Sequence, residues 1–112
     1  MDSREVRVLA SASEEIEEAV AWLSARSKNA AQAFAFGYEE KLCMLASGLI
    51  EYPLSHIPEL ARLGYRATSF GAYTMLYYVE NDVVFIAHVF HQHRNYARLV
   101  ARQEEEWPPP RG

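Results

Sequence analysis

The chain is predicted to be an α+β domain in which a helical hairpin packs on one face of a small antiparallel sheet. Three observations carry this prediction. Residues 5–10 alternate apolar and polar side chains, residues 14–49 carry apolar side chains every three or four positions, and residues 65–91 return to alternation. Alternation is typical of strands, and the longer spacing is typical of helices. The predicted order is β-α-α-β-β-β-α, with the last helix beginning near Arg94.

A single domain is expected, because a chain of 112 residues usually builds one hydrophobic core. Half of the residues are hydrophobic, which is ordinary for a soluble globular protein. The domain is assigned to residues 1–103. Residues 104–112 contain WPPPRG, where three consecutive prolines cannot continue a helix, so we expect a flexible C-terminal tail there.

Cysteine content and hydropathy indicate the compartment. Cys43 is the single cysteine, which excludes an internal disulfide, and we expect it to be a small buried residue of the second helix. The N-terminal residues are charged and have no apolar signal-peptide centre. The longest apolar run, VVFIA, is too short to span a bilayer. We therefore expect a cytoplasmic protein without a membrane partner.

The first helix is predicted within residues 11–27. Ser11 and Glu14 have the spacing of a capping box, and Ser13 is a competing N-cap. Acidic residues in the first turns suit the positive end of the helix dipole. The apolar stripe consists of Ile16, Ala19, Val20 and Leu23.

The second helix is predicted over residues 30–49, with Ser27 or Asn29 as its N-cap. The few residues between the two helices indicate an antiparallel hairpin. Residues 51–64 contain two prolines and a glycine and are interpreted as a connecting loop. The apolar face of the second helix consists of Ala30, Phe34, Tyr38, Leu42, Leu45 and Leu49.

Three late strands are predicted to form a meander over residues 65–70, 73–79 and 83–91. Tight turns join them at Gly71-Ala72 and at Asn81-Asp82, where the residue types tolerate a positive φ. The last strand is apolar on both faces, which predicts a central position in the sheet.

The charge of the chain is unevenly distributed. Residues 1–60 carry five Lys and Arg against ten Asp and Glu, whereas residues 61–100 carry four arginines against two acidic residues. A phosphate or an acidic partner is therefore expected to contact the second half. The net charge of −4 argues against a large nonspecific nucleic-acid binder, which would be basic overall.

The histidines near the end of the last strand do not form a metal motif. In a strand, His91 and His93 share one face and His88 points to the other. Two converging imidazoles without a neighbouring carboxylate are a poor zinc site, so no metal is predicted. His88 lies within an apolar strand and is interpreted as a hydrogen-bonded core histidine.

The best functional corner is formed by His91, His93, Arg94 and Tyr96, where the central strand ends. An imidazole can act as acid or base near neutral pH, and a guanidinium can bind a phosphate or carboxylate through two parallel bonds. For Arg94, the alternative is a solvated helix face.

Arg66 is expected to approach Tyr73 or the corner at residues 91–94, which would bring a second cation there. A surface position on its strand is the alternative for Arg66.

The sheet region resembles the RelE/ParE toxin superfamily of bacterial type II toxin–antitoxin systems. In that superfamily the region typically contains Y-R, then G-x-Y-x-x-x-Y-x-V, an acidic turn, and an apolar strand ending in H-x-x-R. The resemblance covers about residues 5–102. The matching positions in this chain are Tyr65-Arg66, Gly71, Tyr73, Tyr77, Val79, Asn81-Asp82, His91 and Arg94.

The resemblance implies a small toxin of the plasmid-stabilisation type that a cognate antitoxin neutralises. The antitoxin is expected to lie across the helical hairpin or a sheet edge and to contact Trp22, Phe34 and Tyr38. A homodimer or a toxin–antitoxin hetero-oligomer is implied. No cofactor is expected.

Two activities divide the superfamily, since RelE-like toxins cleave mRNA in the ribosome and ParE-like toxins inhibit DNA gyrase. RelE-like toxins usually carry basic residues where this chain has Thr74, Gln92 and His93. These differences favour a ParE-like gyrase inhibitor. Its target-binding residues would be Arg66, Tyr73, His91, Arg94 and Tyr96.

Two alternatives stay open. One is a ribosome-dependent mRNA endonuclease in which His91 or His93 acts with Arg66 and Arg94 as the catalytic set. The other is a degenerate, non-toxic member that only binds a partner protein.

Overall fold

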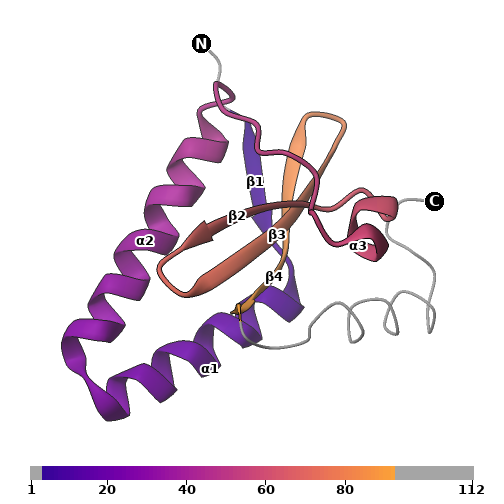
Figure 1. Ribbon diagram of the computed structural model, residues 1–112. Coiled ribbons are helices and arrows are strands. Elements are labelled where there is room, and N and C mark those ends of the chain that lie inside the picture. Colours follow the sequence, from indigo (N-terminus) through magenta and orange to yellow (C-terminus); the bar gives the residue numbers. More distant parts are fainter. Residues whose placement is uncertain (1–3, 93–112) are drawn as a thin grey trace.

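The computed structural model describes residues 4–92, so the predicted last helix and tail lie outside the described residues. Figure 1 shows α1 and α2 as the arms of an open V, with the sheet crossing between them and α3 beyond the sheet. The α+β prediction is confirmed. The elements are β1 Glu5–Val8, α1 Ala10–Arg26, α2 Lys28–Ala46, α3 Pro58–Arg62, β2 Arg66–Phe70, β3 Tyr73–Glu80 and β4 Val83–His91.

The four strands form one sheet in the order β1-β4-β3-β2. The predicted meander of β2, β3 and β4 is confirmed, and β4 is central. The prediction of an antiparallel sheet is wrong for β1, which pairs parallel to β4 from Glu5↔Val83 to Val8↔Ile86. Alternation indicates that a segment is a strand, but it carries no information on the direction of a strand whose partner is distant in sequence.

The first helix begins differently from the prediction. The N-cap of α1 is Leu9, without a side-chain cap, so the capping box of Ser11 and Glu14 is wrong. The Ser11 hydroxyl instead donates to the carbonyl oxygen of Ala87 in β4, at 2.7 Å. A long-range contact has replaced the local one, because the first turn of α1 lies directly against β4.

The start of α1 continues the hydrogen bonding of β1 along the edge of β4. The Leu9 N–H donates to the Ile86 carbonyl oxygen at 2.9 Å, where the strand pairing ends. Ser11 then binds the Ala87 carbonyl, and Glu15 Oε1 accepts from the Val89 N–H at 2.8 Å. Ser11 and Glu15 are one helical turn apart and so share a face. Two side chains thereby satisfy backbone groups on an edge of β4 that no described strand covers.

A bulge in β4 lies at the same place. Leu76 of β3 pairs with His88, and the next residue, Tyr77, pairs with Ile86, so Ala87 is the additional residue. A bulge bends and twists its strand locally. Here it occurs where the neighbour of β4 changes from β1 to α1.

Each face of the sheet carries its own core. The cluster on the hairpin side includes Phe34, Leu45, Met75, Tyr77 and Ile86. A second cluster lies on the side of α3. Its buried residues are Leu60, Tyr65, Leu76, Tyr78, Ala87 and Phe90. The presence of α3 corrects the prediction that residues 51–64 are only a loop, because Pro58 occupies the first turn of α3, where a missing N–H costs nothing.

The second helix confirms one predicted cap and corrects two other expectations. The Ser27 hydroxyl oxygen accepts from the Ala30 N–H, which makes Ser27 the N-cap of α2. The helix ends at Ala46, so Leu49 is not part of its apolar face and is 89% exposed. Cys43 is exposed rather than buried, because it lies on the side of α2 opposite to Phe34 and Leu45.

The described part of the chain contains no helix that is both long enough and apolar enough to cross a bilayer. The predicted turn at Asn81-Asp82 is confirmed, with φ angles of 52° and 64°.

Removal of the Glu15 carboxylate is predicted to destabilise the protein. In Glu15→Ala, the Val89 N–H and the His88 ring lose their common acceptor, and leaving buried donors unpaired costs about 1–3 kcal/mol. Urea unfolding measures the change, with Glu14→Ala as control because Glu14 is exposed on the same helix. Equal stabilities of the two variants would contradict the structural role of Glu15.

Tyr77→Phe is predicted to destabilise the protein by about 1–3 kcal/mol, because the Tyr52 N–H donates to the Tyr77 hydroxyl oxygen and loses this acceptor. Burial is the main cause that raises the pKa of Tyr77 above its ordinary value of 10.0. Ionisation therefore favours the unfolded chain, and the advantage of the wild type should be complete below pH 10 and shrink as the pH rises further. Thermal melts of both proteins from neutral to alkaline pH measure the difference in their stability. A stability difference that stays constant across that pH range would contradict the prediction.

Candidate functional site

Tyr73 and His91 meet at the end of the sheet nearest the bend of the helical hairpin. They are paired residues of β3 and β4, and their rings lie edge to face with centroids 5.3 Å apart. Phe70 stacks on the other side of Tyr73, at 6.3 Å. Two residues of the predicted target-binding set, Tyr73 and His91, are thus in contact, whereas His93, Arg94 and Tyr96 lie outside the described residues.

A groove opens between α1 and this end of β4, with a volume of about 440 Å³. We call it the aromatic groove. Trp22 is its most exposed large hydrophobic side chain, at 54%, and the Arg26 guanidinium lies 3.8 Å from the centroid of the Trp22 ring. The lining residues are Glu15, Glu18, Ala19, Trp22, Tyr73, Val89, Phe90 and His91.

The aromatic groove combines an apolar floor with a carboxylate rim. Glu18 is exposed on α1, whereas Glu15 is held by β4, as described above. From the sequence, both residues are interpreted only as acidic side chains that stabilise the positive end of the helix dipole. No local pattern indicates which of the glutamates turns toward the sheet. A groove of this kind can bind aromatic or aliphatic side chains of a partner through Trp22 and Tyr73.

Arg66 lies at the opposite end of β2. Phe70 pairs with Tyr73 beside the groove, and Arg66 pairs with Tyr77, four residues further along the strand. At about 3.3 Å per residue, this separation is about 13 Å. The expectation that Arg66 approaches Tyr73 or the His91 corner is therefore wrong in this fold.

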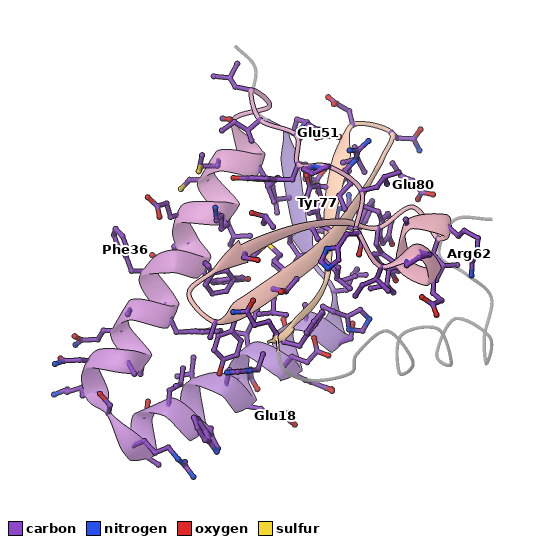
Figure 2. All side chains as sticks on the ribbon, viewed as in Figure 1. Glu18, Phe36, Glu51, Arg62, Tyr77 and Glu80 are labelled. Carbon is purple, nitrogen blue, oxygen red and sulfur yellow. The ribbon has the colours of Figure 1, made fainter. Side chains whose placement is uncertain are left out.

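The Arg66 guanidinium is held by its own neighbours. Nη1 donates to the Tyr52 carbonyl oxygen at 2.7 Å, and Nε lies 3.3 Å from Glu51 Oε2. Figure 2 shows Glu51 and Tyr77 together at this end of the sheet. A second arginine, Arg4, contacts the other oxygen of Glu51 at 3.1 Å. Neither Glu51 nor Arg4 stood out in the sequence, because their pairing depends on the position of the loop after α2.

The three residues assigned to antitoxin binding differ in accessibility. Trp22 is exposed, but Phe34 is only 5% exposed and belongs to the core on the hairpin side. Tyr38 is partly buried beside Phe70, and burial, followed by the nearby charge of Glu39, raises its pKa. Phe34 can therefore shape a binding surface from beneath, whereas Trp22 can contact a partner directly.

A second, smaller cavity of about 250 Å³ lies between the hairpin and the turn joining β2 to β3. Gly37 belongs to its wall, and a Cβ atom there would lie 3.1 Å from the Phe70 ring. The absence of a side chain at Gly37 thus lets α2 approach β2. The lining residues are Leu23, Ala30, Ala33, Phe34, Gly37, Phe70, Gly71, Ala72 and Tyr73.

His88 is the core histidine that the sequence predicted. It is 5% exposed, and its Nδ1 lies 3.1 Å from Glu15 Oε2. Because a carboxylate only accepts hydrogen bonds, Nδ1 carries the proton of this bond. Within residues 4–92, no three His, Cys, Asp or Glu side chains are placed to hold a metal ion.

Comparison with solved structures shows the same fold in two toxin–antitoxin assemblies. A chain of the chromosomal ParDE system from P. aeruginosa superposes with a TM-score of 0.61 and 11% identity, covering 80% of this chain and 96% of that one. A chain of the RelBE2 toxin–antitoxin complex from Mycobacterium tuberculosis gives a TM-score of 0.55 and 21% identity, covering 81% and 93%. A search of curated proteins finds no match.

The family comparison extends over most of the sequence. The model of the ParE toxin of the type II toxin–antitoxin system parDE matches residues 6–96. This range includes every described strand and helix except the first residue of β1. The match and the shared fold agree with the resemblance to the RelE/ParE superfamily. The chain therefore belongs to the ParE toxin family of type II toxin–antitoxin systems.

Proposed function

We propose that this ParE-family toxin inhibits DNA gyrase, acts in the cytoplasm and is neutralised by a cognate antitoxin. One observation carries the choice of gyrase over RNA. Of the two arginines in the alternative catalytic set, Arg66 and Arg94, only Arg66 lies among the described residues, and it is bound to Glu51 and Tyr52 at the other end of the sheet from His91. Cleavage by a 2′-hydroxyl needs an acid, a base and a cation at one phosphate. Inhibition through binding requires no such set.

The aromatic groove is the proposed surface for the target. Trp22 and Tyr73 offer large rings on two rigid elements, α1 and β3, and His91 adds a polar edge. Aromatic residues of this kind dominate the binding energy of many interfaces. Arg94 and Tyr96, which follow β4 outside the described residues, are proposed to extend this surface.

The antitoxin is proposed to cover the helical hairpin. The two assemblies with the same fold are toxin–antitoxin systems, which supports a protein antitoxin as the partner. Trp22 and Tyr38 are the proposed contacts, with Phe34 supporting them from the core. This arrangement would give a hetero-oligomer and shield exposed apolar surface.

The second candidate is a RelE-like mRNA endonuclease. The contact between the His91 imidazole and the Tyr73 phenol favours it, because both rings carry groups that transfer protons. In this version, His91 or His93 would act with Arg94. Arg66 would contribute only after leaving its bonds to Tyr52 and Glu51.

Induction of the chain without an antitoxin is predicted to arrest growth through DNA. Plasmid supercoiling should fall and a DNA-damage response should begin, while mRNA stays intact and protein synthesis continues at first. Northern blots, pulse labelling and agarose gels of plasmid topoisomers measure these effects. Early mRNA cleavage with normal supercoiling would contradict gyrase as the target, and absence of a growth defect would favour a non-toxic partner-binding protein.

Trp22→Ala is predicted to weaken gyrase inhibition by a factor of at least about 10, since removal of a central aromatic side chain typically costs 2 kcal/mol or more. A supercoiling assay with purified proteins measures this effect. Phe36→Ala is the matched control, because Phe36 is 70% exposed on α2 and does not line the aromatic groove. Figure 2 shows Phe36 pointing away from the sheet. Equal inhibition by both variants would exclude the groove as the target surface.

His91→Ala with His93→Ala is predicted to leave toxicity largely intact if gyrase is the target. The reason is that most residues around the central aromatic side chains of an interface contribute little binding energy, whereas a nuclease loses activity with its base. Growth after induction and mRNA integrity measure the effect. If the wild type cleaves mRNA, and the folded double variant neither cleaves mRNA nor arrests growth, the endonuclease would be supported instead.

A further inference from the structure

Two arginines converge on one carboxylate at the end of the sheet away from the aromatic groove. Arg4 Nη2 lies 3.1 Å from Glu51 Oε1, and Arg66 Nε lies 3.3 Å from Glu51 Oε2. Among residues 4–92, Glu51 is the only acidic residue paired with either of them. The group therefore keeps one positive charge in excess. We call Arg4 and Arg66 together the arginine pair.

The arginine pair is held in place by bonds that do not involve Glu51. The Arg4 guanidinium donates to the Leu45 carbonyl oxygen at the end of α2, and its backbone N–H donates to the Ala46 carbonyl oxygen at 2.7 Å. The Arg66 guanidinium donates to the Tyr52 carbonyl oxygen. A cation that is fixed before binding loses little conformational freedom when an anion arrives.

Glu51, in contrast, is the most exposed of the three side chains, since that of Arg66 is 33% exposed. Its side chain is 41% exposed, whereas that of Arg4 is 12% exposed. It also belongs to a segment outside every helix and strand. Exposed ion pairs contribute little to stability, because water and salt screen them. Exchange of Glu51 for another carboxylate would leave the charge balance of the arginine pair unchanged.

The surroundings of the arginine pair are apolar and exposed. Leu49 lies two residues before Glu51 and is 89% exposed, and Leu54, which forms a bridge with Arg66, is 49% exposed. Exposed leucines in the segment that carries Glu51 suit a peptide whose acidic residue has apolar neighbours. A nucleic-acid backbone would instead require a row of cations, since each phosphate carries its own charge.

We propose that the arginine pair is a receptor for an acidic side chain of a partner protein, and that Glu51 occupies it until the partner displaces it. The site lies at the far end of the sheet from the aromatic groove and does not depend on gyrase as the target. Arginine binds carboxylates with strong, directional hydrogen bonds, so the receptor would distinguish glutamate from glutamine. Glu51 acts as an intramolecular competitor that lowers the affinity.

The test uses the full chain and two capped pentapeptides, acetyl-ALELA-amide and acetyl-ALQLA-amide. NMR titration of the arginine Nε–H signals measures binding. Glu51→Gln is expected to bind the glutamate peptide at least tenfold more tightly than the wild type does, because the competitor is gone. The glutamine peptide should bind at least tenfold more weakly than the glutamate peptide. Equal binding of both peptides to Glu51→Gln would overturn the proposal.

Two further proteins locate the site. Glu51→Gln combined with Arg66→Gln should lose the preference for the glutamate peptide, and Glu51→Gln with Arg66→Lys should keep part of it, because the charge remains and the planar fork does not. An unchanged preference in both double variants would overturn the proposal. Tighter binding of inorganic phosphate than of the glutamate peptide to Glu51→Gln would assign the site to phosphate instead. Supercoiling assays on the same proteins test the gyrase proposal separately.

Discussion

The hydrogen bonds between the start of α1 and the outer edge of β4 are the constraint on which the rest of the molecule depends. β4 is one of the two interior strands, and β1 covers only the first part of the edge of β4 that faces away from β3. Beyond Ile86, unpaired backbone groups next to an apolar core would be costly. Ser11 and Glu15 remove that cost with side-chain bonds. They also fix the direction of α1, and hence the hairpin that shields the core on that face of the sheet.

The same constraint separates two regions of different chemistry. At one end of the sheet, the side of α1 next to its buried stripe joins β4 in an aromatic groove around Trp22, Tyr73 and His91. At the other end, the loop after α2 brings Glu51 between Arg4 and Arg66. Arg66 and His91 therefore lie at opposite ends of the sheet. This separation is typical of a protein that binds partners at two places. A nuclease would instead concentrate its catalytic groups at a single phosphate.

Local patterns predicted much of this fold and less of its site. The meander, the cap at Ser27 and the core position of His88 followed from periodicity and residue type, because neighbours in sequence decide them. The parallel pairing of β1, the inward turn of Glu15 and the position of Arg66 did not. Each of these depends on a partner far away in sequence. The local sequence around a charged residue in a helix or strand is the same whether its side chain faces water or binds a distant backbone group.

The pairing of the first strand with the last has a consequence for how the chain acquires its structure. Among the described strands, β1 pairs only with β4, and Glu15 meets His88 across 73 residues of sequence. Contacts between such distant segments form late and slow folding, because a long loop must close before they contribute. During synthesis, α1 and α2 can form early as a local hairpin, but the sheet cannot close until β4 has left the ribosome. The folded domain is therefore reached only when nearly the whole described chain has been made.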